Sequence, residues 1–183
     1  MAATVKKNIW LLKTADGRRA NTETHLIAAS QGILVPNTPV YLSQDGTVKR
    51  CATADGSHEL LYGFLKGTVD KSTTWPLTAE LAGNTQVYVE VAQAGNQYCI
   101  YVENNDSDAA MVQSYVGEEY GWRIASGAGK VGYATMDVNN ANVMMHVVAA
   151  YFNLDSSLKS KTADSPGIAV VRFPASVLEG ELA

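Results

Sequence analysis

Three short stretches of the sequence begin like motifs that carry chemistry. The stretch from His58 to Tyr62 opens as a zinc-protease helix does, but Tyr62 stands where the second histidine ligand is required. Residues 126–131 read Ser-Gly-Ala-Gly-Lys-Val, similar to a phosphate-binding loop. Such a loop needs Gly at 124 and Ser or Thr at 131, and the sequence has Ile124 and Val131. The zinc motif therefore fails, and residues 126–131 are interpreted as a flexible turn between strands.

The third stretch is acidic. Asn104, Asp106 and Asp108 alternate like the first ligands of a calcium loop. Ala109 stands where that loop requires Gly, and Tyr115 replaces the bidentate Glu. We expect a solvated acidic loop, and a weak divalent-cation site is the alternative.

A nucleophilic enzyme would need a Cys or Ser beside a His and an orienting carboxylate. The chain has only three His and two Cys, and no local motif joins them. The one candidate pair is Cys99 with His146, and His146 lies in an apolar run where a hydrogen-bonded core histidine is the usual case. The sequence therefore predicts no catalytic residues, no metal ligands, no cofactor and no enzyme activity.

The composition of the chain is unusual for a soluble domain. The 183 residues carry only 17% charged side chains against about 25% in soluble domains, with 46% hydrophobic residues. The net charge is -4 and the 14 Lys and Arg are scattered, which argues against a nucleic-acid partner. Low charge indicates either an exterior covered by a partner or a surface made of Ser, Thr, Asn and Gln.

The sequence predicts neither secretion nor membrane insertion. The first residues lack the apolar region of a signal peptide, and no run reaches the ~18 to 20 apolar residues needed to span a bilayer. We expect synthesis in a reducing cytoplasm, where Cys51 and Cys99 are two buried thiols rather than a disulfide.

Strand signals dominate the chain. Residues 87–91 and 98–102 alternate or run apolar, and the turn-rich stretch between them predicts a hairpin. A second hairpin is predicted over residues 40–51 around Asp45-Gly46, because Gly accepts the positive φ of a tight turn. Further strands are predicted at 60–65, 143–151 and 168–173, the last stopped by Pro174. The fold class is all-β, a sandwich or barrel of mostly antiparallel strands with an N-terminal arm.

The chain divides into three predicted segments. Residues 1–30 form an N-terminal arm or long loop, because 13–24 are polar and lack periodicity; the alternative is a strand over residues 5–12 followed by an exposed loop. Residues 31–75 form a β-hairpin module, and residues 76–183 form a β-sandwich or barrel module.

Nine Tyr and three Trp outnumber three Phe, and Tyr and Trp are favoured at protein interfaces and carbohydrate-binding surfaces. The alternative is that they are half-buried strand formers. The strand over 143–151 is apolar on both faces, so it is either central in the fold or pressed between subunits. We therefore predict a homo-oligomer with an interface formed by Tyr98, Tyr101, Trp122, Met145 and Val147.

One segment resembles a known family. Residues 39–67 run Pro-Val-Tyr-Leu, a short Asp-Gly turn, a return strand, a polar loop, and then Tyr-Gly-Phe-Leu. This layout resembles the head decoration, or capsid cement, proteins of tailed bacteriophages. Decoration proteins of this kind are small β-rich oligomers, often trimers, that bind the outside of an expanded capsid.

The resemblance implies a virion structural protein on the capsid exterior, with the major capsid protein as its partner. It favours a trimer, with a dimer as the alternative, and it carries over no functional residues. A carbohydrate- or receptor-binding β-sandwich module of a virion or tail is the alternative function.

Overall fold

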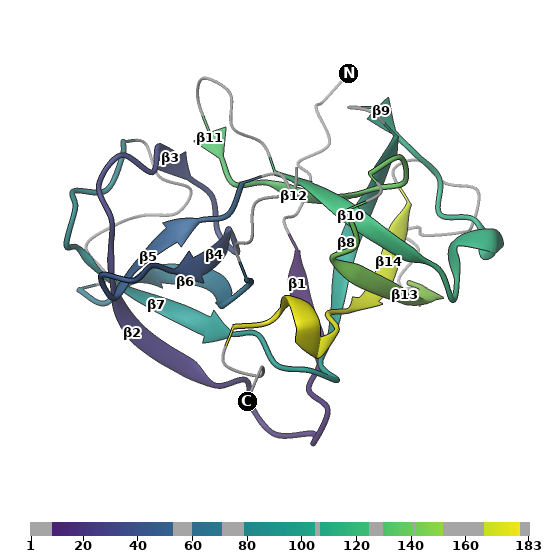
Figure 1. The fold of residues 1–183 in the computed structure, drawn as a ribbon, viewed down its shortest axis with the longest axis horizontal. Helices are drawn as coiled ribbons and strands as arrows, with labels where there is room; N and C mark the ends of the chain where they lie inside the picture. The colour runs from purple at the N-terminus through teal and green to yellow at the C-terminus, as the bar shows by residue number, and fades with distance from the viewer. Residues whose placement is uncertain are drawn as a thin grey trace.

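The computed structural model describes residues 9–52, 60–70, 79–104, 107–124, 130–140, 142–151 and 167–179. Strands dominate this part of the chain, and they form a closed barrel and a large sheet (Figure 1). The only helical elements among these residues are two short 3₁₀ turns, η1 (Gln113–Tyr115) and η2 (Ala175–Val177). The predicted all-β fold class is confirmed.

The barrel has the strand order β2-β5-β4-β6-β7. Its strands are β2 (Thr22–Ile27), β4 (Pro39–Leu42), β5 (Thr47–Arg50), β6 (Gly63–Thr68) and β7 (Gln86–Val91). All neighbours pair antiparallel except β2 with β5. Its buried interior consists of Ile27, Leu34, Val40, Val48, Leu65, Val87 and Val89. These side chains are all aliphatic, and in each strand they alternate with residues that point outward.

The hairpin predicted over residues 40–51 is confirmed. Val40 pairs with Arg50 and Leu42 with Val48. The chain reverses at Gly46, whose φ of 78° is the left-handed conformation that glycine adopts without steric cost. The strand predicted at 60–65 starts later than expected, as β6, and a bulge between Leu65 and Gly67 lets it continue to Thr68.

The large sheet has the strands β1 (Trp10–Lys13), β8 (Gln97–Asn104), β9 (Ser107–Asp108), β10 (Glu119–Ile124), β12 (Ala134–Asp137), β13 (Met145–Ala150) and β14 (Ile168–Arg172). β8 pairs with both β12 and β14, and the pairings β12-β10-β13-β14 return to it. The sheet therefore has an inner face, where Tyr98 and Ile100 of β8 lie, and an outer face, where Cys99 and Tyr101 lie. The strands predicted at 143–151 and 168–173 correspond to β13 and β14.

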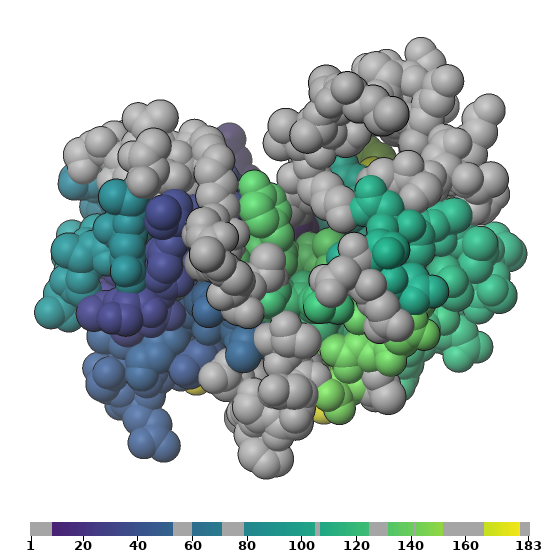
Figure 2. Space-filling model, turned by 90° about the horizontal axis from the view of Figure 1, so that it is seen from above, coloured from purple at the N-terminus to yellow at the C-terminus, as the bar shows by residue number. Residues whose placement is uncertain are grey.

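The barrel and the large sheet share one core and lie side by side (Figure 2). Phe64 points away from the barrel interior, and its ring lies 5.0 Å from that of Tyr98 and 5.9 Å from that of Phe173. Two short pairings add to this packing. The residues around η2 form a bridge between Leu61 and Leu178, and β3 (Ile33–Leu34) pairs in parallel with β11 (Lys130–Val131).

The predicted hairpin over 87–102 is wrong. Both edges of β7 are occupied, one by β2 and one by β6, so that β7 closes the barrel. The chain then turns through Gly95, with φ of 83°, and β8 enters the large sheet instead. A five-residue linker permits a hairpin, but it does not require one.

The sheets also cut across the predicted segments. β1 and β2 lie within residues 1–30, so the described residues 9–30 contain two strands as well as loop segments. β2 belongs to the same barrel as β7, which lies within 76–183. The polar character of residues 22–25 arises because most of them face solvent on the barrel's outside. Residues 1–8 lie outside the described residues.

Candidate functional site

The five residues predicted to form an interface are buried inside the protein. Tyr98, Trp122, Met145 and Val147 are at most 1% exposed and belong to the core shared by the barrel and the large sheet. Tyr101 is 7% exposed and packs on the outer face of the large sheet. For Tyr98, Trp122, Met145 and Val147 the prediction of contact with a partner is therefore wrong, while Tyr101 is buried within a cluster on the sheet's outer face. These four side chains are apolar or aromatic because they fill the core of their own chain.

Strand β13, which is apolar on both faces, explains part of the wrong interface prediction. Met145 and Val147 point into the shared core, while Val148 and Ala149 pack on the opposite side of the sheet. A register shift between Val147 and Ala149 changes the alternation at that point. The strand is thus covered on one face by its own core, and only its other face reaches the outer surface.

The outer face of the large sheet carries a second apolar cluster. Its buried members are Cys99, Tyr101, Ile168 and Val170, and its half-buried members are Trp10, Val148, Ala149 and Tyr151. The Trp10 ring meets Tyr101 and Tyr151 edge to face, at centroid distances of 6.0 and 6.2 Å. We call this set the outer apolar face. It combines aromatic area with polar ring tips, which is the composition typical of protein interfaces.

Cys99 is not placed for nucleophilic chemistry. It is fully buried, and burial raises the pKa of its thiol to about 12. Its strand neighbours are Trp10 and Val170, whereas His146 pairs with Arg172. The two members of the candidate pair therefore lie at different positions of the sheet. Cys51 and Cys99 are both buried free thiols, as the sequence predicts.

His146 is not the core histidine expected from its apolar segment. Its side chain is 43% exposed, and Nε2 lies 2.9 Å from Oε1 of Glu119 on the neighbouring strand. The apolar run therefore has one polar position, at the point where β13 meets β10.

A carboxylate, a phenol and an imidazole meet on the outside of the barrel. The Tyr62 hydroxyl donates to Oε2 of Glu23 at 2.5 Å, and His25 Nε2 lies 2.8 Å from the same hydroxyl. The hydroxyl has one proton, so His25 acts as the donor to Tyr62. The bond from Tyr62 lowers the pKa of Glu23, and burial together with Glu23 raises the pKa of Tyr62.

The cluster of Glu23, Tyr62 and His25 has a structural role in this geometry. With its pKa raised, Tyr62 stays protonated near neutral pH and is a hydrogen-bond donor rather than a base. The cluster ties β2 to the segment that precedes β6. The spacing of Glu23 and His25, two residues apart on one face of a strand, is the one local signal for this cluster in the sequence.

The zinc-like, calcium-like and phosphate-loop-like stretches of the sequence lie partly outside the described residues. Within the described ranges, no group of three or more His, Cys, Asp or Glu could hold a metal ion. Asp106 of the calcium-like stretch, His58 and Glu59, and residues 126–129 of the phosphate-loop-like stretch lie outside the described residues. No helix in the described part of the chain is long and apolar enough to cross a membrane.

Comparison with models of protein families, with curated proteins and with solved structures found no match. The outer apolar face is therefore the candidate site on geometry alone.

Proposed function

We propose that this chain is a virion structural protein that binds the outer surface of an expanded phage capsid as an oligomer. Its partner is the major capsid protein, and its site of action is the capsid exterior. The role is mechanical: the protein adds buried contact area across the joints between capsid subunits.

The observation that supports the proposal is the position of the strands of residues 39–67 in the barrel. The segment that resembles capsid cement proteins supplies three neighbouring barrel strands, in the order β5-β4-β6. Its Asp-Gly turn forms the reversal between β4 and β5, and its Tyr-Gly-Phe-Leu run leads into β6. The described parts of this segment, residues 39–52 and 60–67, thus lie on neighbouring strands of one barrel.

The outer apolar face supports a contact role for the large sheet. Trp10 and Tyr151 are half buried there, and Leu12 on the same strand as Trp10 is 41% exposed. Contact with a neighbouring copy or with the capsid would cover these side chains and gain roughly 25 cal/mol for each Å² of apolar surface removed from water. A standard interface buries about 1,600 Å² in total, so several elements must take part.

An oligomer makes weak contacts effective. Each copy in an oligomer binds its own capsid subunit, and the second contact forms within an already bound complex, which raises the overall affinity. We expect a trimer, with a dimer as the alternative. Light scattering at micromolar concentration measures this directly, and a monomer there would contradict the oligomeric proposal.

The functional experiment uses expanded, undecorated heads assembled from a phage major capsid protein. Purified protein is mixed with the heads, sedimented, and the heads are then challenged with heat. We expect saturable co-sedimentation and a higher temperature of head disruption. Absence of co-sedimentation, or bound protein that leaves the disruption temperature unchanged, would contradict the proposal.

The aromatic cluster on the outer apolar face keeps carbohydrate binding as a second candidate. Trp122 is buried and cannot serve as its test residue, but Trp10 is half buried beside Tyr151. A glycan array separates the two functions. Saturable glycan binding that Trp10→Ala abolishes would favour the carbohydrate module, and no binding on the array would favour the capsid role.

A further inference from the structure

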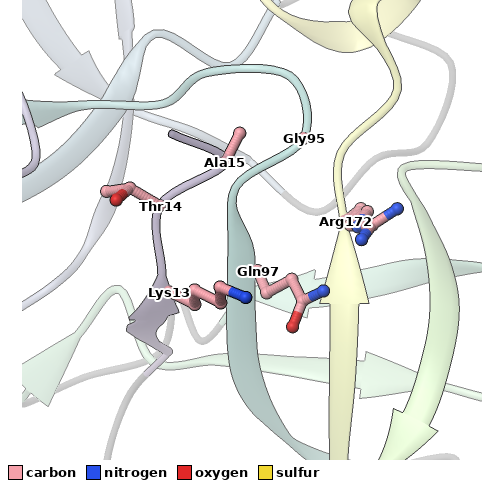
Figure 3. Close-up of a pocket in the computed structure, with 6 residues that line it drawn as sticks. All are labelled: Lys13, Thr14, Ala15, Gly95, Gln97 and Arg172. Carbon is pink, nitrogen blue, oxygen red and sulfur yellow. The ribbon is translucent and has the colours of Figure 1, made fainter. Parts of the chain in front are cut away.

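A pocket of about 280 Å³ opens at the end of the large sheet where β1, β8 and β14 meet (Figure 3). It is lined by Lys13, Thr14, Ala15, Gly95, Gln97 and Arg172. In Figure 3 the Lys13 side chain reaches toward Gln97 of β8, and Gln97 extends toward β14, where Arg172 lies.

The strand register explains why these side chains meet. Lys13 pairs with Gln97, and Val171 pairs with Tyr98, so the next position brings Arg172 beside Gln97. On the other edge of β14, Arg172 pairs with His146, which in turn pairs with Glu119. Paired residues on neighbouring strands project from the same face of a sheet. One polar row therefore crosses five strands: Lys13, Gln97, Arg172, His146 and Glu119.

The cationic end of this row has no internal counter-charge among the described residues. Lys13 and Arg172 are exposed, and neither forms an ion pair within the described ranges. The nearest acidic groups along the row and the chain have partners of their own. Glu119 pairs with His146 at 2.9 Å, and Asp16 pairs with Arg18 at 3.5 Å.

Two of the neutral polar groups of the pocket already form hydrogen bonds within the chain. The Thr14 hydroxyl donates to the carbonyl of Arg18 at 2.5 Å, and the Ala15 N–H donates to Oδ1 of Asn96 at 3.0 Å. The groups left to meet a ligand are the Lys13 ammonium, the Arg172 guanidinium and the Gln97 amide. Ammonium and guanidinium groups only donate hydrogen bonds, so the pocket is rich in donors and selects an anion.

We infer that this pocket binds a carboxylate of an acidic segment presented by a partner protein. The planar guanidinium of Arg172 matches a carboxylate through two parallel hydrogen bonds, and Lys13 adds a second positive charge. Trp10 of the outer apolar face lies on the same strand as Lys13, so a peptide chain held at the pocket can also pack on apolar surface. A protein segment offers both kinds of contact together.

Nucleic acid fits the same pocket less well. Its binding depends on many phosphate contacts, and the pocket supplies two cations on a chain of net charge -4. The inference rests on residues other than the 39–67 segment, and it stands or fails separately from the capsid proposal.

The test measures binding of a fluorescein-labelled peptide of alternating aspartate and glutamate by fluorescence anisotropy. The matched probe is the corresponding asparagine and glutamine peptide, and a single-stranded oligonucleotide is the third probe. The variants are Lys13→Gln, Arg172→Gln and the double variant. Lys49→Gln, a cation on β5 of the barrel, is the charge-matched control, and thermal melting verifies that each variant is folded.

We expect saturable binding of the acidic peptide by the full chain and none of the amide peptide. Arg172→Gln should weaken binding about tenfold or more, as expected for loss of a charge-assisted hydrogen bond, and Lys49→Gln should leave it unchanged. Equal binding of both peptides, equal weakening by Lys49→Gln, or tighter binding of the oligonucleotide would overturn the inference. Absence of saturable peptide binding by the folded wild-type chain would overturn it as well.

Discussion

The barrel and the large sheet are both made of short β-strands, but they bury apolar surface in different ways. The barrel encloses a small interior of Ile, Leu and Val, and the outside of β2 is largely solvent-exposed. The large sheet carries apolar side chains on both faces of β8, β13 and β14. Its inner face also provides the aromatic residues that contact Phe64 of the barrel.

The barrel thus encloses one apolar interior, whereas the large sheet carries a second apolar cluster on its outer face, where Trp10 and Tyr151 are half buried. A barrel has no free strand edges, and polar residues on its outside suit contact with water. The outer apolar face of the large sheet has the composition of an interface and borders a cationic pocket. The large sheet is therefore the part of the molecule where we expect partner contacts.

The largest effect is expected at the core that joins the two regions. Trp122 is 1% exposed, and its ring lies 5.9 Å from that of Phe173. Trp122→Ala should lower the free energy of unfolding by about 3 to 5 kcal/mol, because it removes a large buried side chain and leaves a cavity. Urea denaturation followed by circular dichroism measures this. A loss below about 1 kcal/mol would contradict a shared core.

The next effect concerns closure of the barrel. A Cβ on Gly63 would lie 2.3 Å from the carbonyl oxygen of Glu90 on β7, so Gly63→Ala should separate β6 from β7. We expect a loss of about 1 to 3 kcal/mol, as for other overpacked sites.

Gly17→Ala is the matched control for Gly63→Ala. No atom lies within 4 Å of its new Cβ, but its φ is 73°, so it should cost about 1 kcal/mol from the backbone alone. Equal losses for the two variants in urea denaturation would show that β6 and β7 are not closely paired at Gly63.

A smaller effect on stability is expected from Glu23, on the polar outside of the barrel. The bond from Tyr62 lowers the pKa of Glu23, so its stabilising contribution is complete above the ordinary value of 4.5 and is lost as the pH falls through the lower folded value. Because Glu23 is 45% exposed, we expect under about 1 kcal/mol.

Thermal melts of wild type and Glu23→Gln between about pH 3 and 7 measure this contribution. The two proteins should converge in stability at the acid end and differ near neutral pH. A stability difference that grows as the pH falls would contradict the assignment.

The smallest expected effect is the chemical reactivity of Cys99, a buried member of the outer apolar face. Cys99 is fully buried and burial raises the pKa of its thiol, so at pH 8 the thiol is protonated and shielded from reagents. We expect no measurable alkylation of native protein by iodoacetamide within an hour and complete alkylation of both cysteines in urea. Rapid labelling of Cys99 in the native protein, mapped by mass spectrometry, would contradict its burial under the side chains of the outer apolar face.

Local features of this fold could be predicted from the sequence, and long-range pairings could not. The β4–β5 hairpin follows from Asp45-Gly46, because the turn chemistry and both strands lie within a few residues. The pairing of β7 was not predictable, since β2 lies about sixty residues earlier and its polar sequence looks like a loop.

The sequence also does not predict which residues pack against each buried side chain. Apolar residues on both faces of a strand indicate burial, but they do not say whether the cover is the same chain or another one. For that reason the sequence predicts Trp122 and Tyr98 at an interface, and the structure covers them with Phe173 and Phe64 of the same chain. The polar row from Lys13 to Glu119 depends on the register of five strands, which no local pattern contains.

The most direct test of the difference between the two regions is head binding by two matched variants. Trp10→Ala removes an aromatic side chain from the outer apolar face, and Leu26→Ala removes an apolar side chain that is 40% exposed on the barrel. Both are compared with wild type in the co-sedimentation assay, after melting curves verify folding. We predict that Trp10→Ala weakens binding about tenfold or more and that Leu26→Ala binds as wild type does. Full binding by folded Trp10→Ala together with lost binding by Leu26→Ala would contradict the account and place the contact on the barrel.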